Sequence, residues 1–374
     1  MSFDGGSSVG KFRGFVGAFV FIVGLGLVGS IGSALAAEQD ANLYQQACDK
    51  GVASDCNKLG IMYDEGLFVE LNAEKAVSLY KLACDGGNFE GCSNLGWSYI
   101  YGSGVNPAAY KAVALFEKGC EAKDLMSCTN LGWVYERGTG VAQDLVKAGD
   151  LYKLSCDGGW AEGCYELGVY YFNAKKGPFG NLDPSGLFTG EGTVSKANLR
   201  KAAELYQKAC DMGLTLACVN SGVFHLRQGF SEDQAAIDSS HFKKAIRLFS
   251  KACTGEDVQG CLKLGNMYLM GWGVVLNPSA ASTYFEQSCE AGLAEGCTKI
   301  GSLYYAGRGV ERNVLKAFEL FTLACDGGDG NGCVRQSKMY ESGIGVDKDP
   351  VEAKKHLNKA CENKLNLECI QRKP

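Results

Sequence analysis

The stretch CDGGNFEGCSNLGWSYIYGSGVNPAAYKAVALFEKGC, residues 84–120, decides the fold of this chain of 374 residues. It begins with a Cys-x7-Cys pair, continues through Leu-Gly-x-x-Tyr and Gly-x-Gly-Val, and ends at the cysteine that opens the next pair. The first cysteines of successive pairs are 36 residues apart in six of eight intervals, and 54 and 43 residues apart in the other two. A fixed period of this length predicts a stacked repeat rather than a domain with one core.

All 18 cysteines of the chain belong to such pairs. An even count with one fixed spacing predicts local disulfides, and disulfides persist in oxidising compartments. Zinc binding is the weaker alternative, because structural zinc ligands usually lie about two to four residues apart. We expect nine disulfides: Cys48–Cys56, Cys84–Cys92, Cys120–Cys128, Cys156–Cys164, Cys210–Cys218, Cys253–Cys261, Cys289–Cys297, Cys325–Cys333 and Cys361–Cys369.

Each unit contains two amphipathic segments. Counted from the Gly of Leu-Gly-x-x-Tyr, the second cysteine at −4, the Leu at −1 and the Tyr at +3 share one helical face, and the Gly permits close approach of a neighbouring helix. The second segment spaces Ala76, Leu79, Tyr80 and Cys84 along another apolar face. The sequence therefore predicts an all-α fold of paired helices.

The third residue after the first cysteine of each pair is expected to end a helix in the left-handed conformation, which favours glycine. Glycine occupies this position at Gly51, Gly87, Gly159, Gly213, Gly292 and Gly328. The other three repeats have Lys123, Glu256 and Lys364 there.

The N-terminal segment has the pattern of an export signal. Lys11 and Arg13 precede an apolar run over residues 15–28, and small residues follow up to Ala36. This order is typical of a signal peptide over residues 1–36, cleaved after Ala36, which leaves residues 37–374 as the repeat region of a secreted or periplasmic protein. A retained membrane anchor over residues 12–37 is the alternative.

This pattern resembles the Sel1-like repeat, a relative of the tetratricopeptide repeat, and its Cys-x7-Cys version is similar to the Helicobacter cysteine-rich protein family. The resemblance covers residues 38–374. It implies a right-handed α/α superhelical solenoid of about eight to nine repeats with a concave groove. That family is described as penicillin-binding with weak β-lactamase activity, so the resemblance makes a β-lactamase the alternative function.

Several positions depart from the repeat. Ser221 replaces the Leu and Ser337 replaces the Gly of Leu-Gly, and His225 replaces the Tyr. Insertions fall near residues 173–196 and 227–241, where the intervals between cysteine pairs are longer. We therefore expect the groove to be less regular around the fifth and sixth repeats.

The sequence does not identify catalytic residues. Ser78 and Ser240 begin Ser-x-x-Lys matches, but Ser-Asp-Asn and Lys-Thr-Gly partners do not occur. Ser78 also occupies a repeat position of varied polar residues, which is typical of a solvated helix face. His225, His241 and His356 are dispersed in the sequence and form no metal motif, so neither a metal nor a cofactor is expected. Any lactamase activity rests on the resemblance alone.

Positions two before and one after the repeat Gly are the candidate ligand groove: Asn94, Trp97, Asn130, Trp133, Lys263, Lys299, Arg335 and Lys338. We hypothesise that the amides bind a peptide backbone, the indoles an apolar side chain and the basic residues a carboxylate. Peptides, proteins and peptidoglycan-derived or β-lactam ligands share these features. The alternative is that the Trp residues pack between repeats while Asn and Lys solvate the surface.

Two further expectations concern partners. The net charge of −5 and the absence of a basic stripe argue against nucleic acid. After signal cleavage, no membrane contact is expected, and the chain is expected to be a monomer.

Overall fold

The computed structural model describes residues 30–173, 196–230 and 239–362, and this part of the chain is all-helical, as the repeat pattern predicts. Most of the predicted signal peptide lies outside the described residues. None of the described helices is both long and apolar enough to cross a lipid bilayer. The helices are α1 Ser30–Asp49, α2 Ala53–Glu65, α3 Ala73–Asp85, α4 Phe89–Tyr101, α5 Ala109–Glu121, α6 Leu125–Arg137, α7 Leu145–Asp157, α8 Ala161–Asn173, α9 Lys196–Asp211, α10 Thr215–Gly229, α11 Ser239–Thr254, α12 Val258–Met270, α13 Pro278–Glu290, α14 Ala294–Ala306, α15 Val314–Asp326, α16 Gly330–Ser342 and α17 Pro350–Glu362.

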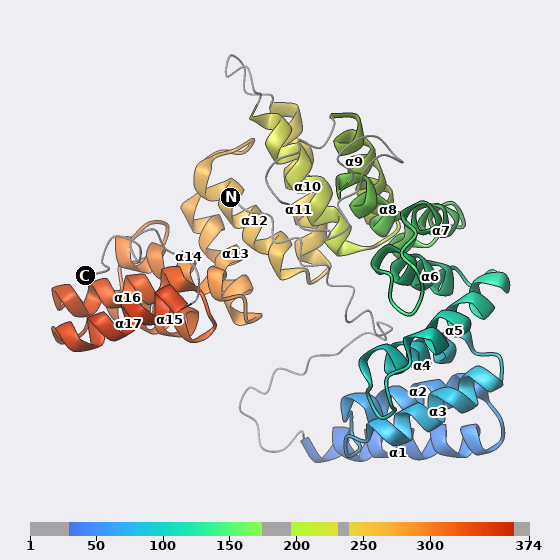
Figure 1. Ribbon diagram of the computed structural model, residues 1–374. Helices are drawn as coiled ribbons and strands as arrows, with labels where there is room; N and C mark the ends of the chain where they lie inside the picture. The colour runs from blue at the N-terminus through green and yellow to red at the C-terminus, as the bar shows by residue number, and fades with distance from the viewer. Residues whose placement is uncertain (1–29, 174–195, 231–238, 363–374) are drawn as a thin grey trace. The chain divides into compact units, whose positions relative to one another are not determined.

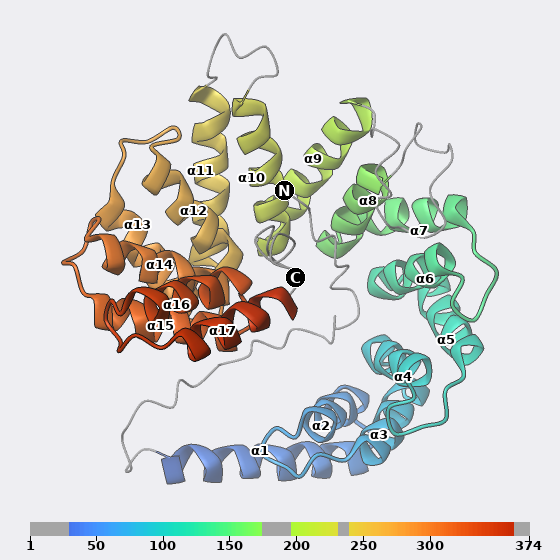
Figure 2. The ribbon, with the colours of Figure 1, turned by 60° about the vertical axis from the view of Figure 1, so that its left-hand side comes forward.

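The chain divides into two compact units, Met1–Ala202 and Ala203–Pro374. Consecutive helices pack against one another from α1 to α8 and from α10 to α17, as Figures 1 and 2 show. The first helices of neighbouring repeats also touch: α2 with α4, α4 with α6 and α6 with α8 in the first unit, and α10 with α12 and α14 with α16 in the second. In these pairs of repeats the first helices form a row that runs from one repeat to the next.

The Gly of Leu-Gly is required for the packing of the two helices of a repeat. A Cβ added to Gly96 in α4 would lie 2.5 Å from Cε1 of Phe116 in α5. A Cβ on Gly132 would likewise lie 2.7 Å from the ring of Tyr152. The aromatic side chain of the second helix thus lies directly on the backbone of the first, which confirms the close approach that the sequence predicts.

Disulfides join the end of one repeat to the start of the next. Eight of the nine predicted pairs are formed in the described residues, from Cys48–Cys56 to Cys325–Cys333, with Cα atoms 4.3–4.7 Å apart. Cys369 of the ninth pair lies outside them. This many disulfides indicates an oxidising, extracytoplasmic environment.

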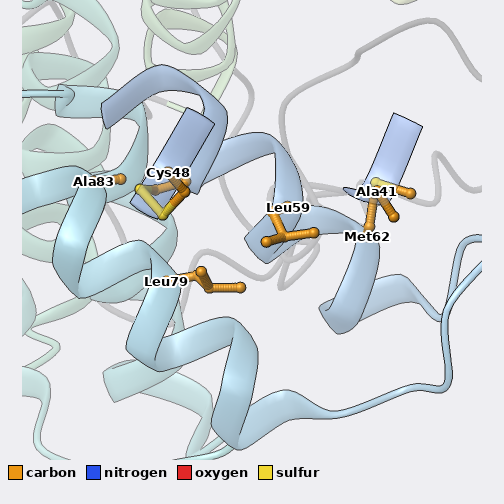
Figure 3. Packing of buried hydrophobic residues seen from close by; sticks show 7 residues of the cluster. Ala41, Cys48, Leu59, Met62, Leu79 and Ala83 are labelled. Carbon is orange, nitrogen blue, oxygen red and sulfur yellow. A yellow bond between two sulfur atoms is a disulfide. The ribbon is translucent and has the colours of Figure 1, made fainter. Parts of the chain in front are cut away.

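Apolar side chains from three successive helices fill the space beside each disulfide. In the first repeat, Leu59 of α2 and Leu79 of α3 pack with Ala41 and Cys48 of α1, and all are buried (Figure 3). A core of this kind is shared between neighbouring repeats, so a single repeat cannot bury its apolar face alone.

The helix caps follow the predicted pattern. The backbone φ at the cap is 88° for Gly51 and 87° for Gly87. Lys123 and Glu256 adopt the same left-handed conformation, with φ of 67° and 64°, although their side chains disfavour it. Lys364 lies outside the described residues.

Candidate ligand-binding surface

Asn94 and Asn130 connect the first helices of neighbouring repeats. Nδ2 of Asn94 donates a hydrogen bond to Oδ1 of Asn57, 2.9 Å away, and Nδ2 of Asn130 donates to Oγ of Ser93, 3.2 Å away. The two asparagines are only 7% and 8% exposed. Their amide nitrogens therefore link α2 to α4 and α4 to α6, and their contact with a ligand stays a prediction.

Trp97 and Trp133 meet edge to face across α4 and α6, with ring centroids 4.9 Å apart. Trp97 also stacks on Tyr101, at 5.8 Å, and the guanidinium of Arg137 lies 4.8 Å from the centre of the Trp133 ring. Tyr101 and Arg137 are exposed, Trp97 is half-buried and Trp133 is buried. We call these four side chains the Trp–Arg patch.

Sequence reasoning found the two tryptophans of this patch but missed Tyr101 and Arg137. Each of the missed residues follows its tryptophan by four positions, and side chains at this spacing are neighbours on a helix surface. The i+4 position could therefore have identified them.

One polar atom in the patch lacks a hydrogen-bond partner. Nε1 of Trp133 is buried and has no acceptor in the structure. A buried donor left unpaired costs about 1–3 kcal/mol. An oxygen acceptor that reached this nitrogen would recover that free energy.

Two acidic side chains lie next to the patch, Glu166 buried and Glu136 half-buried. Burial raises the pKa of Glu166 to about 8, the charge of Glu136 adds to the shift, and Arg137 opposes it. Burial also raises the pKa of Glu136, which accepts a hydrogen bond from the hydroxyl of Tyr152. Glu166 is only 5% exposed and occupies the repeat position of Asn94 and Asn130. At neutral pH its carboxyl group is thus largely protonated and can donate a hydrogen bond.

The four predicted basic residues all belong to the second unit, on α12, α14 and α16. Lys263 and Lys299 are half-buried, whereas Arg335 and Lys338 are exposed. Nζ of Lys299 lies 3.8 Å from the carboxylate of Glu295 one turn earlier. The predicted groove residues therefore fall into two sets, one in each unit.

At Ser78, the hydroxyl group and the lysine of the Ser-x-x-Lys match have other partners. Ser78 is exposed, and its hydroxyl donates to the backbone oxygen of Glu74 at 3.0 Å. Nζ of Lys81 instead pairs with Asp85, 2.9 Å away. Ser240 lies in the first turn of α11. The lactamase alternative stays a prediction without a supporting geometry at Ser78.

Two of the three histidines, although dispersed in the sequence, meet in the fold. Nδ1 of His225 in α10 lies 2.9 Å from Nδ1 of His241 in α11. Burial lowers the pKa of His225 to about 4, and the charges of His241 and Lys244 contribute. His356 stacks on Tyr340 with ring centroids 5.6 Å apart.

Comparison with known proteins yields one family. The family model described as Sel1 repeat matches nine segments that together make up most of the chain: residues 53–88, 89–124, 125–160, 161–181, 186–214, 242–257, 258–293, 294–329 and 333–365. No curated protein matches the chain in sequence.

Several solved structures are similar. A protective antigen of uropathogenic Escherichia coli with an SLR fold is 24% identical, with a TM-score of 0.59 over 86% of this chain, which spans 64% of the antigen's length. A Sel1 repeat protein from Oxalobacter formigenes is 20% identical, with a TM-score of 0.57 over 88% of each chain. Cysteine rich protein B of Helicobacter pylori is 32% identical over 38% of this chain and 98% of its own, with a TM-score of 0.29. The first two likenesses agree with the repeat fold described above.

Proposed function

The chain belongs to the Sel1 repeat family, and from this premise we propose that it is an exported interaction scaffold whose Trp–Arg patch binds a peptide segment of another protein. The observation that carries the proposal is the patch itself. Exposed Tyr101 and Arg137 extend half-buried Trp97 and buried Trp133 to the surface across two neighbouring repeats. Trp, Tyr and Arg are the residue types that dominate binding energy at protein interfaces.

The chemistry of the patch favours a ligand with an apolar side chain and an oxygen acceptor. Tyr101 is 54% exposed and stacked on Trp97, so it offers a rigid aromatic face. The exposed guanidinium of Arg137, over the Trp133 ring, favours a carbonyl or carboxylate oxygen. A peptide backbone with one apolar side chain supplies both groups.

The burial of the Trp133 side chain indicates that the site is preorganised. Trp133 is 8% exposed and is held between Trp97 and Arg137, so little side-chain freedom is left to lose on binding. The two Asn hydrogen bonds fix α4 and α6 relative to their neighbours. A ligand would therefore meet aromatic rings that are already in place.

Export forms part of the proposal. The oxidising environment that the disulfides require is consistent with residues 1–36 being a signal peptide, and with a secreted or periplasmic location. Detection of a mature N-terminus at Ala37 by N-terminal sequencing of the exported protein would test this part separately.

The test of binding is selection of random short peptides displayed on phage against the oxidised protein. We expect enriched peptides to bind the Tyr101→Ala and Arg137→Ala variants at least about tenfold more weakly, as for central interface residues. Tyr110→Ala and Arg308→Ala are matched controls, since both side chains are exposed and outside the patch. Equal binding by the patch variants and the wild type would contradict the proposal.

A further inference from the structure

Two of the three histidines of the chain face each other at one point of the second unit. Nδ1 of His225 lies 2.9 Å from Nδ1 of His241, and the ring centroids are 5.1 Å apart. The two residues come from adjacent helices, α10 and α11, and are 16 positions apart in the sequence. The contact is thus a tertiary one, made by the packing of the two helices.

Each histidine occupies a position where other repeats have a different residue with its own structural role. His225 stands where the repeat has the Tyr of Leu-Gly-x-x-Tyr, whose hydroxyl accepts a hydrogen bond from Lys in three repeats, for example Lys147 to Tyr135. His241 lies twelve residues before Cys253, where several repeats have the Asn or Asp that caps the second helix: Asn72, Asp144, Asn277 and Asn313. Two independent departures in one repeat therefore produce a single contact.

The surrounding packing holds the pair in place. Phe242, which follows His241, is fully buried, and its ring packs on Phe230 with centroids 4.9 Å apart. A Cβ on Gly229 would lie 2.7 Å from the Phe242 ring, so α10 and α11 are in close contact beside the histidines. The position of His241 is therefore set by the core and not by the surface.

The distance between the two nitrogens matches that of two ligands of one metal ion. Imidazole nitrogens bind such an ion at about 2.0–2.1 Å, so two of them lie about 2.9 Å apart at a right angle and about 3.3 Å apart at the tetrahedral angle. Two imidazole nitrogens this close must share either a proton or a metal ion, because two lone pairs repel and two N–H groups clash.

From this geometry we infer that His225 and His241 form a binding site for one first-row transition-metal dication of the kind that imidazole prefers, Cu²⁺ or Zn²⁺. In the described part of the chain, no group of three or more His, Cys, Asp or Glu side chains could hold a metal ion. The described part of the chain thus supplies these two ligands, and water would complete the coordination. The positive charge of Lys244 nearby opposes the ion, so the site is weaker than a four-ligand structural zinc site.

The metal site would be a second cross-link of this repeat, in addition to its disulfides. The disulfides Cys210–Cys218 and Cys253–Cys261 hold the start of α10 and the end of α11. The histidines join the other ends of the same two helices, where the interval between cysteine pairs is 43 residues instead of 36. The metal would thus fasten the hairpin at the end that the disulfides do not reach.

The experiment uses the full, tag-free, oxidised chain after treatment with a chelator, and measures binding of Zn²⁺ and Cu²⁺ by equilibrium dialysis with elemental analysis. We expect one ion per chain. His225→Tyr and His241→Asn, which restore the residues of the other repeats, should each weaken binding at least about tenfold, because one of two protein ligands is lost. His356→Asn is the matched control and should leave binding unchanged.

Two results would overturn the inference. One is a wild-type chain that takes up less than one ion at concentrations that saturate free imidazole, which would mean that the pair shares only a proton. The other is equal binding by the wild type and the His225→Tyr and His241→Asn variants. Pulsed electron paramagnetic resonance of Cu²⁺ on the wild-type chain gives a check that needs no variant: two coordinated imidazoles support the site, and one or none refutes it.

Discussion

The hydroxyl of Tyr152 donates a hydrogen bond to Oε2 of Glu136, 2.9 Å away, between the two helices of the third repeat. The first repeat has the same pairing, from Tyr80 to Asp64, at 3.3 Å. The second repeat has Phe116 and Ile100 at the corresponding positions, and thus no polar group on either side. A half-buried acid and its tyrosine donor therefore occur together or not at all in these three repeats.

This relationship predicts the effect of removing the donor. Tyr152→Phe should lower the free energy of unfolding by about 1–3 kcal/mol, because the half-buried carboxyl group of Glu136 loses its tyrosine donor. Adding Glu136→Ile, which reproduces the second repeat, should recover most of that loss. Urea denaturation of the oxidised proteins measures both values, and a double variant as unstable as Tyr152→Phe would disprove the coupling.

Glu166 predicts how stability depends on pH. Its folded-state pKa of about 8 lies above the ordinary value of 4.5, so the folded state binds the proton more tightly than the unfolded state. Its contribution is therefore complete below about pH 4.5 and is lost as the pH rises through about 8. Two other repeats have an asparagine, Asn94 or Asn130, at the position of Glu166. We therefore expect Glu166→Asn to flatten the decline in unfolding free energy between these pH values. An unchanged slope in the variant would assign the decline to other groups.

Gly96 predicts a steric effect. Gly96→Ala should destabilise the protein by about 1–3 kcal/mol, because the new Cβ would lie 2.5 Å from Cε1 of Phe116. In the last repeat the chain itself has Ser337 in place of the glycine and Leu357 in place of the aromatic residue. Phe116→Leu should therefore reduce the cost of Gly96→Ala, which thermal unfolding of the single and double variants would reveal. Additive losses would show that the ring is not the obstacle.

The left-handed backbone conformation of Lys123 predicts that a substitution by glycine stabilises the protein. Its φ of 67° is unfavourable for a residue with a Cβ, and most other repeats have glycine at this position. Lys123→Gly should raise the free energy of unfolding, by at most about 1 kcal/mol because glycine also gains freedom in the unfolded chain. Lys118→Gly, in an exposed position within α5, is the control and should destabilise by about 1 kcal/mol. A loss of stability in Lys123→Gly would show that the left-handed cap is not strained.

The sequence predicts the fold in detail because the same motif recurs in every repeat, so each structural element is predicted several times. The cysteine spacing predicts the eight disulfides that the described residues contain, and the glycine after Leu predicts the contact of Gly96 with Phe116. The position of the cap predicts the positive φ of Lys123. Each of these features depends on residues that are close in the sequence.

The candidate site was less predictable because it depends on contacts between repeats. Periodicity assigns Asn130 and Trp133 to one face of α6, but it does not reveal that α4 covers this face and buries both side chains. The histidine pair was missed for a related reason: an insertion separates His225 from His241 in the sequence. Counting back from Cys253 would have aligned His241 with the helix caps and Lys244 with the lysines that pair with tyrosine.

The local character of the disulfides has a consequence for how the chain is made. Each bond links cysteines only eight positions apart, and none of the eight in the described residues joins distant parts of the chain. A pair is therefore complete as soon as its short segment reaches an oxidising compartment, while the rest of the chain is still being synthesised or transported. Correct pairing can proceed in order from the N-terminus, so maturation should need an oxidant but little help from an enzyme that reshuffles wrong pairs.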